Sequence, residues 1–128
     1  MNSLKKISFC VLLFLFSCPK KIEGSGLKVK FKNATGFDIK NLKIANQSIG
    51  FLKSMESTKY LKFKKFGFDS GYPDETCSGL IDNIEIKSYN ELFICGTEKK
   101  SIHKGIFEME IILTKVDGIS YLRLNLKH

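Results

Sequence analysis

The residue types best suited to metal binding or nucleophilic catalysis are four cysteines and two histidines in a chain of 128 residues. One conceivable zinc set combines the thiols of Cys77 and Cys95 with the imidazoles of His103 and His128. Structural zinc sites use close ligand pairs such as C-x-x-C or H-x₃₋₅-H, and this chain has neither spacing. We therefore expect no metal site. A Cys95–His103 nucleophile pair is conceivable, but it competes with a disulfide for the same thiol.

Sequence motifs that carry catalysis or phosphate binding are also absent. The chain contains no G-x-G-x-x-G or G-x-x-x-x-G-K-[ST] loop, and neither G-x-S-x-G nor H-E-x-x-H occurs. Carboxylates gather in FDSGYPDET, which holds Asp69, Asp74 and Glu75. Such oxygens can bind Ca²⁺, but the spacing is not that of an EF-hand, and an ordinary solvated turn has the same composition. We expect a protein that is not an enzyme, with no catalytic residues and no cofactor.

Lysine supplies nearly all of the positive charge, and this bears on possible anionic partners. The chain has 21 basic and 13 acidic residues, a formal charge of +8, and Arg123 is its one arginine. Because arginine is favoured for bidentate phosphate contacts, we expect no nucleic-acid partner. Lysines and aromatic residues interleave over 58–66, which predicts a face for an anionic polymer or a lipid head group. Alternatively, the same lysines protect a strand edge from aggregation. The candidate residues are Lys59, Lys62, Lys64 and Lys65.

The N-terminal segment 1–17 has the order of charge and hydrophobicity typical of a signal peptide. Two lysines precede an apolar run over 7–16, which is shorter than the about 20 residues that span a bilayer. The run leads into residues 15–18, LFSC, which resemble a bacterial lipobox, although Phe16 departs from the small or β-branched residue of that motif. The resemblance implies that the Cys18 thiol is acylated and that Cys18 becomes the first mature residue.

Two other fates of this segment stay open. Gly24 and Gly26 lie three and one positions before Leu27, as ordinary signal peptidase requires, and cleavage there gives a secreted soluble protein. That site lies eight residues beyond the apolar run, which argues against it. An uncleaved anchor is the third possibility. In the favoured interpretation residues 18–26 carry the lipid and form a flexible tether, and residues 27–128 form a single domain.

The remaining cysteines suggest an oxidising compartment. Cys10 leaves with the signal peptide and Cys18 takes the lipid, so Cys77 and Cys95 remain. An exported chain would pair them. The disulfide would close a loop of about 19 residues and contribute roughly 3 kcal/mol through the entropy of the unfolded chain.

Strands, rather than helices, must position these residues. Apolar and polar residues alternate over 27–32, 107–113 and 122–126, and a period of two predicts strands with one wet face. The apolar positions shift by one residue between Ile39 and Leu42, and this shift predicts a β-bulge near Lys40 and Asn41. Tight hairpin turns are expected at two places, Asp82-Asn83 and Asp117-Gly118.

The predicted fold class is all-β. With 43% hydrophobic residues the chain is too apolar for disorder. We expect seven to eight strands in an antiparallel β-sandwich of immunoglobulin-like or transthyretin-like kind. The Cys-Trp-Cys signature of antibody-type domains is missing, so the order of the strands is not specified. One strand is predicted over 58–66, with Leu61 and Phe63 facing the core. The stretch 68–79 is predicted to be a long loop, and 92–95 a short buried strand.

The chain resembles small uncharacterised bacterial envelope lipoproteins of lysine-rich, Gram-negative proteomes. The resemblance rests on the lipobox-like Cys18 and on segments 49–53, 68–72 and 95–100, IGFLK, FDSGY and CGTEKK. It implies a lipid-anchored protein of the cell envelope, at the outer membrane facing the periplasm, and it carries over no functional residues.

The function expected from these features is that of a non-enzymatic β-sandwich module. Its partners would be the membrane, through the N-terminal lipid, and an unknown envelope protein or an anionic polymer. The alternative is a periplasmic inhibitor or immunity protein that acts on a hydrolase or toxin through loops 67–79 or 96–105.

Overall fold

A computed structural model describes residues 26–89 and 98–127, and within these ranges the chain forms strands and turns without a helix. The predicted strand at 92–95 lies outside the described residues. The eleven strands of the described part are β1 (Leu27–Asn33), β2 (Ile39–Ile44), β3 (Gln47–Leu52), β4 (Leu61–Phe63), β5 (Phe66–Asp69), β6 (Tyr72–Pro73), β7 (Cys77–Ile81), β8 (Ile84–Lys87), β9 (Lys99–Ile102), β10 (Gly105–Val116) and β11 (Ile119–Leu126).

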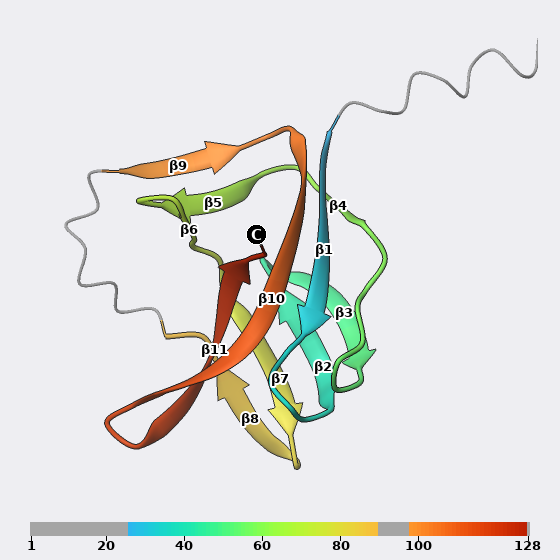
Figure 1. Ribbon diagram of the computed structural model, residues 1–128, viewed down its shortest axis with the longest axis vertical. Coiled ribbons are helices and arrows are strands. Elements are labelled where there is room, and N and C mark those ends of the chain that lie inside the picture. Colours follow the sequence, from blue (N-terminus) through green and yellow to red (C-terminus); the bar gives the residue numbers. More distant parts are fainter. Residues whose placement is uncertain (1–25, 90–97, 128) are drawn as a thin grey trace, which may run out of the picture.

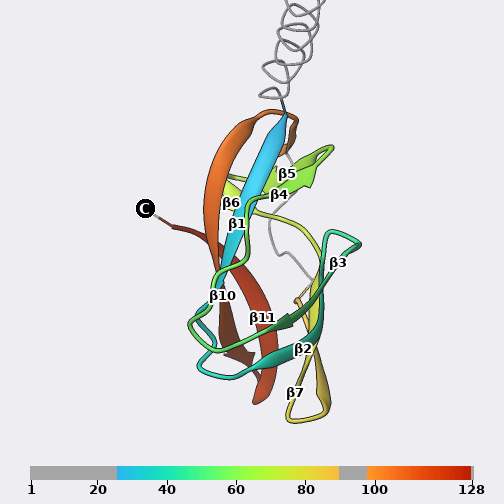
Figure 2. The same cartoon turned by 90° about the vertical axis from the view of Figure 1, so that its right-hand side faces the viewer.

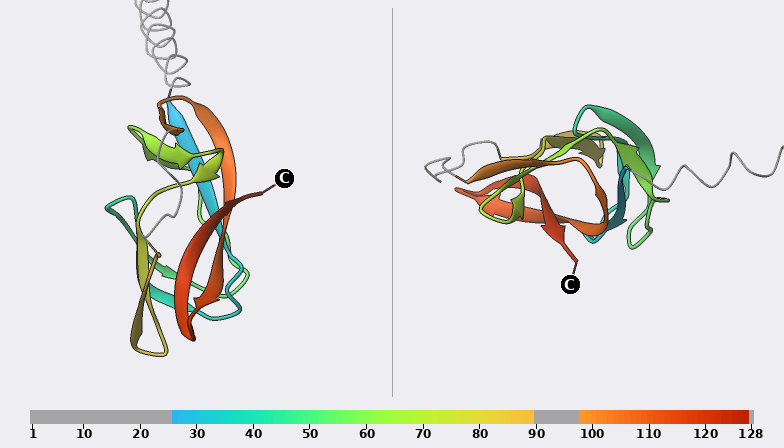
Figure 3. Two further views of the ribbon diagram at one scale, coloured as in Figure 1. Left: turned by 90° about the vertical axis from the view of Figure 1, so that its left-hand side faces the viewer. Right: turned by 90° about the horizontal axis from the view of Figure 1, so that it is seen from above.

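These strands form three sheets around one core (Figure 1). Sheet A has the order β11-β10-β1-β4, sheet B the order β3-β2-β7-β8, and sheet C the order β6-β5-β9. Sheet A makes one layer, and sheets B and C lie opposite it, with sheet C nearer the point where the chain enters β1 (Figures 2 and 3). The predicted all-β sandwich is therefore confirmed. The predicted count of seven to eight strands is wrong, since the described residues alone contain eleven.

Three local features explain the higher count, and one of them is β9, which lies in the segment 96–105 expected to be a loop and pairs with β5. The segment 58–66, predicted as one strand, holds β4 and the start of β5, because the consecutive Lys64 and Lys65 interrupt the alternation and shift its phase. The predicted loop 68–79 contains a hairpin in which Asp69 lies opposite Tyr72. Ser70 and Gly71 form its turn with φ angles of 51° and 84°, which suits the twist of a two-residue hairpin.

The other predicted turns and the bulge are confirmed. Asp82 and Asn83 join β7 to β8 with φ angles of 50° and 63°, and Asp117 and Gly118 join β10 to β11 with 52° and 80°. The register between β2 and its neighbours shifts around Asn41, whose φ is 51°. An extra residue in one strand of a pair bends that strand and increases its twist.

One pair of these strands is parallel, whereas the other pairs are antiparallel. β1 runs alongside β10 from Leu27 opposite Gly105 to Asn33 opposite Ile111. β1 therefore lies in the interior of sheet A, with β4 on its other side, although it is the first strand of the chain.

The core joins all three sheets and lies wholly between Leu27 and Leu124. Phe66 of β5 is fully buried, with its ring centroid 6.3 Å from that of Phe31, 5.4 Å from that of Phe63 and 5.8 Å from that of Phe68. Phe107 extends the group, 5.9 Å from Phe68. This phenylalanine cluster connects sheet A to sheet C, and a chain that begins at Pro19 keeps every strand and the whole described core. The buried apolar residues are Leu27, Val29, Phe31, Ile39, Leu42, Ile44, Leu52, Phe66, Phe68, Cys77, Ile81, Met109, Ile111, Leu122 and Leu124.

Candidate anion-binding face

The alternation of β1 places lysines on the outer face of sheet A. Leu27, Val29 and Phe31 are buried, whereas the lysines between them are half-exposed on the opposite side. The same period-two alternation that drives the apolar residues into the core therefore aligns the lysines along one face. We call this surface the lysine face; it comprises Lys28, Lys30, Lys32, Lys62 and Lys127.

Residues that lie opposite one another on neighbouring strands form rows across sheet A, and these rows differ in their charge balance. Lys30 lies opposite Glu108 and Lys32 lies opposite Glu110, so a carboxylate stands beside each of these lysines. The first row is different, because Lys28 lies between Lys62 of β4 and Ile106 of β10 and the row holds no carboxylate. Positive charge is therefore least compensated where the chain enters β1.

A shallow pocket of about 50 Å³ opens on the lysine face. That volume has room for a water molecule or a small anionic group, and not for an extended substrate. Three lysines line it, together with a serine, a glutamate and a methionine. The lining residues are Lys30, Lys32, Ser57, Glu108, Met109 and Lys127.

Glu108 organises the polar groups beside this pocket. Tyr60 Oη donates a hydrogen bond of 3.1 Å to Glu108 Oε1, and Lys127 Nζ lies 3.8 Å from Glu108 Oε2. Lys30 Nζ lies 5.5 Å from the centre of the Tyr60 ring, within reach of a cation–π contact. The hydrogen bond to Glu108 raises the pKa of Tyr60, and desolvation and the negative charge of Glu108 act in the same direction. Ionised Tyr60 would lose its donated proton and face a carboxylate.

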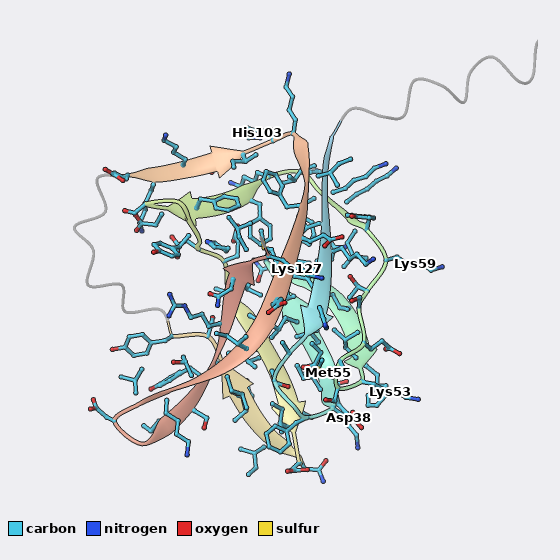
Figure 4. The ribbon with its side chains drawn as sticks, in the orientation of Figure 1. Asp38, Lys53, Met55, Lys59, His103 and Lys127 are labelled. Atoms are coloured by element: carbon cyan, nitrogen blue, oxygen red, sulfur yellow. The ribbon has the colours of Figure 1, made fainter. Side chains whose placement is uncertain are left out.

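The structure brings only part of the sequence-predicted lysine set onto this face. Lys62 lies opposite Lys28 in β4, the edge strand of sheet A. Lys64 and Lys65 are exposed in the connection to β5. Lys59 is exposed before β4 and points outward from the molecule (Figure 4). Because β4 is an edge strand, both predicted roles of these lysines stay open: an anionic partner and protection of the edge.

Sequence reasoning missed the lysines that border the pocket. The alternation in LKVKFK places Lys28, Lys30 and Lys32 on one face, but nothing local to that segment indicates its neighbours. Lys127 and Glu108 join the site through the pairing of β10 with its neighbours, which involves residues far apart in the chain.

Cys77 is the one predicted disulfide residue within the described ranges. Its thiol is free and 2% exposed, and burial raises the pKa of the thiol from 9.0 to about 12. Cys95 lies outside the described residues, so the disulfide stays a prediction. His103 is exposed between β9 and β10, near the point where the chain enters β1 (Figure 4), and His128 lies outside the described residues.

The acidic segment does not assemble into an ion site. Asp69 is 2% exposed in β5, where its Oδ1 accepts a hydrogen bond of 3.2 Å from Ser70 Oγ. Glu75 Oε2 instead accepts the backbone N–H of Gly67 at 2.8 Å, which fixes the chain beside β5. Within 26–89 and 98–127, no three His, Cys, Asp or Glu side chains gather as metal ligands.

Two loops at the far end of the sandwich form a second candidate surface, the loop tip, residues 34–38 and 53–57. Asn33 is fully buried beneath it, and Asn33 Nδ2 donates to the carbonyls of Phe37 at 2.7 Å and of Leu52 at 3.0 Å. The backbone N–H of Met55 donates to the Asn33 carbonyl at 2.8 Å. The side chains of Phe37 and Met55 remain 48% and 62% exposed.

Cys18 and the predicted signal peptide and tether up to residue 25 lie outside the described residues. Among the residues that are described, no helix has the length and apolar character needed to cross a membrane. Comparison with protein-family models, with curated proteins and with solved structures found no match to this chain.

Proposed function

We propose that the chain is a membrane-anchored envelope lipoprotein whose β-sandwich is a non-enzymatic binding module. The anchor is the acylated Cys18 of the lipobox-like segment, and the binding surface is the lysine face. The observation that carries the binding role is the pocket bordered by Lys30, Lys32 and Lys127. The groups around it form an open basic surface, which suits holding an anionic group rather than transferring a proton in a closed site.

The charge balance of the face supports an anionic partner. Glu108 approaches Lys127 at 3.8 Å, with about two fifths of each side chain exposed, so this pair is screened by water and contributes little. The lysine face remains positive overall, because its five lysines outnumber the two carboxylates, Glu108 and Glu110, that lie among them. A partner with several negative groups, such as an acidic polymer or an acidic protein surface, would gain both association rate and specificity from it.

The anchor is tested by metabolic labelling of the full chain with a radioactive fatty acid. Labelling of the wild-type chain and its loss on Cys18→Ser support acylation at Cys18. Cys10→Ser is the matched control, because the proposed processing removes Cys10, and it should keep the label. Label that persists after Cys18→Ser would contradict the proposed anchor.

The lysine face is tested on immobilised inorganic polyphosphate with a chain that begins at Pro19. Lys30→Glu combined with Lys32→Glu should elute at clearly lower salt than the unmodified chain. Lys40→Glu combined with Lys43→Glu changes the net charge equally but alters exposed lysines of sheet B. Equal losses in the two variants would mean that net charge, not the lysine face, controls binding.

The loop tip favours a second candidate function, an inhibitor or immunity protein. Met55 has a φ of 67°, an uncommon conformation for a non-glycine residue, and the hydrogen bond from its backbone N–H to the Asn33 carbonyl holds it in place. A rigid loop that presents exposed Phe37 and Met55 costs little entropy when it docks on a partner. The two loops predicted for this role are less well supported: 67–79 is largely hairpin, and 96–105 holds the strand β9 in its described part, while its first two residues lie outside the described residues.

This second function is tested by co-purification from an envelope extract. A hydrolase or toxin bound in a one-to-one ratio, lost on Phe37→Asp with Met55→Asp, would support it. Ile84→Asp alters a residue that is 63% exposed on β8 and is the control. A partner that survives the loop-tip substitutions but is lost on Lys30→Glu with Lys32→Glu would assign binding to the lysine face instead.

A further inference from the structure

The first row of sheet A carries a local concentration of positive charge around an exposed apolar residue. Lys28 lies directly opposite Lys62 on one side and Ile106 on the other, and Ile106 is 70% exposed. Lys104 precedes β10, and Lys64 follows β4; both are exposed. We call this surface the basic end; it comprises Lys28, Lys62, Lys64, Lys104 and Ile106.

The lysine pair at the basic end is unfavourable for the isolated domain. Like charges directly opposite one another on neighbouring strands destabilise a sheet. Neither Lys28 nor Lys62 has a carboxylate partner within 26–89 and 98–127, whereas Lys30 and Lys32 each stand beside a glutamate. An external anionic surface that faces this row would relieve the repulsion.

The position of the basic end decides which anionic surface that is. The chain enters the domain here, because Leu27 pairs with Phe63 on one side and Gly105 on the other, and Gly105 N donates to Gly26 O at 3.2 Å. Figures 1 and 2 show the start of β1 at this end of the domain. The eight residues between Cys18 and Leu27 can span at most about 30 Å, so a lipid on Cys18 keeps this end close to the bilayer.

We infer that the basic end docks on the anionic head groups of the membrane that holds the anchor, with Ile106 entering the interfacial region. The inference rests on the proposed lipid anchor. Lysines near an anionic membrane surface each add to the attraction, which decays within a Debye length, about 10 Å at 0.1 M salt. An apolar side chain among them adds burial in the interface. Docking in this way directs the loop tip away from the membrane.

The chain contains no tryptophan, so one introduced at the basic end reports directly on its surroundings. The test uses a chain that begins at Pro19 and carries Ile106→Trp, mixed with phosphatidylglycerol-containing or pure phosphatidylcholine vesicles. The expected result is a blue shift of emission with the anionic vesicles only. Ile119→Trp is the control, because Ile119 is 57% exposed but lies beyond the opposite end of β10.

Three results would overturn the inference: no shift at position 106, equal shifts at positions 106 and 119, or equal shifts with both kinds of vesicle. A shift of the same size with soluble inorganic polyphosphate would also overturn it, since a polyanion without an apolar layer would then explain the signal. The chain used lacks Cys18, so failure here leaves the fatty-acid labelling test untouched. Conversely, failure of the labelling test would overturn docking on the membrane that holds the anchor, and a positive vesicle result would then show only that the basic end binds anionic lipid.

Charge-reversal substitutions measure the electrostatic contribution to vesicle binding. Lys28→Glu, Lys62→Glu and Lys104→Glu together should lower affinity for the anionic vesicles by at least about 100-fold, because three lysine attractions are lost and repulsion is added. Lys40→Glu, Lys43→Glu and Lys115→Glu give the same net charge on exposed sites elsewhere and should keep most of the affinity. Lys62→Glu alone should weaken vesicle binding while raising the urea midpoint, because it replaces repulsion opposite Lys28 by attraction. Equal losses in both triple variants, or an unchanged affinity in the first, would contradict docking through the basic end.

Discussion

The basic end and the loop tip lie at opposite ends of one sandwich and are held by different physical means. Beneath the basic end, the phenylalanine cluster joins sheets A and C through ring contacts of 5.4 to 6.3 Å. Beneath the loop tip, the side chain of Asn33 makes hydrogen bonds of 2.6 to 3.1 Å to the surrounding loops. Apolar burial is non-directional, whereas the hydrogen bonds of a buried amide require their donors and acceptors to be aligned.

This difference suits the two proposed roles. A membrane surface is laterally uniform, so the basic end needs charge and an apolar residue on a stable support rather than precise side-chain placement. A protein partner is recognised by shape, and exposed Phe37 and Met55 can be placed precisely only if the loops beneath them are fixed. The following predictions separate the two supports.

The largest effect is expected from Phe66→Ala. Phe66 is fully buried among three other phenylalanine rings, so its loss leaves a cavity and should lower the free energy of unfolding by about 3–5 kcal/mol. Urea unfolding followed by circular dichroism measures this. Phe51→Ala is the matched control, because Phe51 is 49% exposed and its loss should cost no more than about 0.5 kcal/mol. Similar losses in both variants would refute a dominant phenylalanine cluster.

A smaller, local effect is expected from Asn33→Ala. The substitution leaves the carbonyls of Phe37 and Leu52 without their donor and should lower the free energy of unfolding by about 1–3 kcal/mol. Hydrogen exchange should accelerate at the backbone amides of Ser54 and Met55 and stay unchanged in β10. Asn125→Ala, on the half-exposed outer face of β11, is the control. Faster exchange throughout the domain would mean that Asn33 supports the whole sandwich.

The thiol of Cys77 lies in neither region and reports on the integrity of the core between them. Its pKa in the folded state, about 12, is above the ordinary 9.0, so the folded state favours the protonated thiol. The resulting stability is complete below pH 9 and is lost as the pH rises from about 9 to about 12. In the reduced chain the loss should be about 1.4 kcal/mol at pH 10 relative to Cys77→Ala.

The same thiol distinguishes local from global loosening and tests the predicted disulfide. Alkylation of Cys77 should accelerate in Phe66→Ala and stay slow in Asn33→Ala, whose effect is confined to the loop tip. Without reductant, a Cys77–Cys95 disulfide would remove both the alkylation and the pH dependence. An intact mass two hydrogens lower than that of the reduced chain would identify the bond, and free thiols in the exported protein would exclude it.

The smallest effect concerns the row next to the basic end. Glu108→Gln removes the negative charge beside Tyr60, so the pKa of Tyr60 should fall toward its ordinary value. Absorbance titration of phenolate formation, with Tyr60→Phe to identify the signal, measures the change. Glu110→Gln is the control and should leave Tyr60 unaffected. The Glu108 variant should also bind polyphosphate more tightly, because Lys30, which lies opposite position 108 and lines the pocket, would then have no carboxylate beside it.

Local patterns were sufficient for much of the fold. The alternation in 27–32, 107–113 and 122–126 predicted β1, β10 and β11 and the faces that they bury. Asp82-Asn83 and Asp117-Gly118 predicted their hairpins because few residues adopt positive φ easily. The hairpin at Ser70 and Gly71 was missed, since its strands are too short to show a period.

The candidate site was predicted less completely. Lys62 was identified from its own segment, but its neighbour Lys28 and the pocket residues Lys30 and Lys127 were not. Their proximity comes from strand pairing between the two ends of the chain. No periodicity within a segment specifies which distant segment lies beside it.

The sequence by itself determined the lysine-bearing faces, the hairpin turns at Asp82-Asn83 and Asp117-Gly118 and the lipobox-like Cys18, because each depends on residues within one strand or one turn. The tertiary structure alone decided that β1 runs parallel to β10, with β4 on its other side. That pairing joins residues far apart in the chain and is selected by the burial of a common core, above all the packing of Phe31 and Phe66. It is this selection that gathers lysines from separate segments into one face and leaves its first row without a carboxylate.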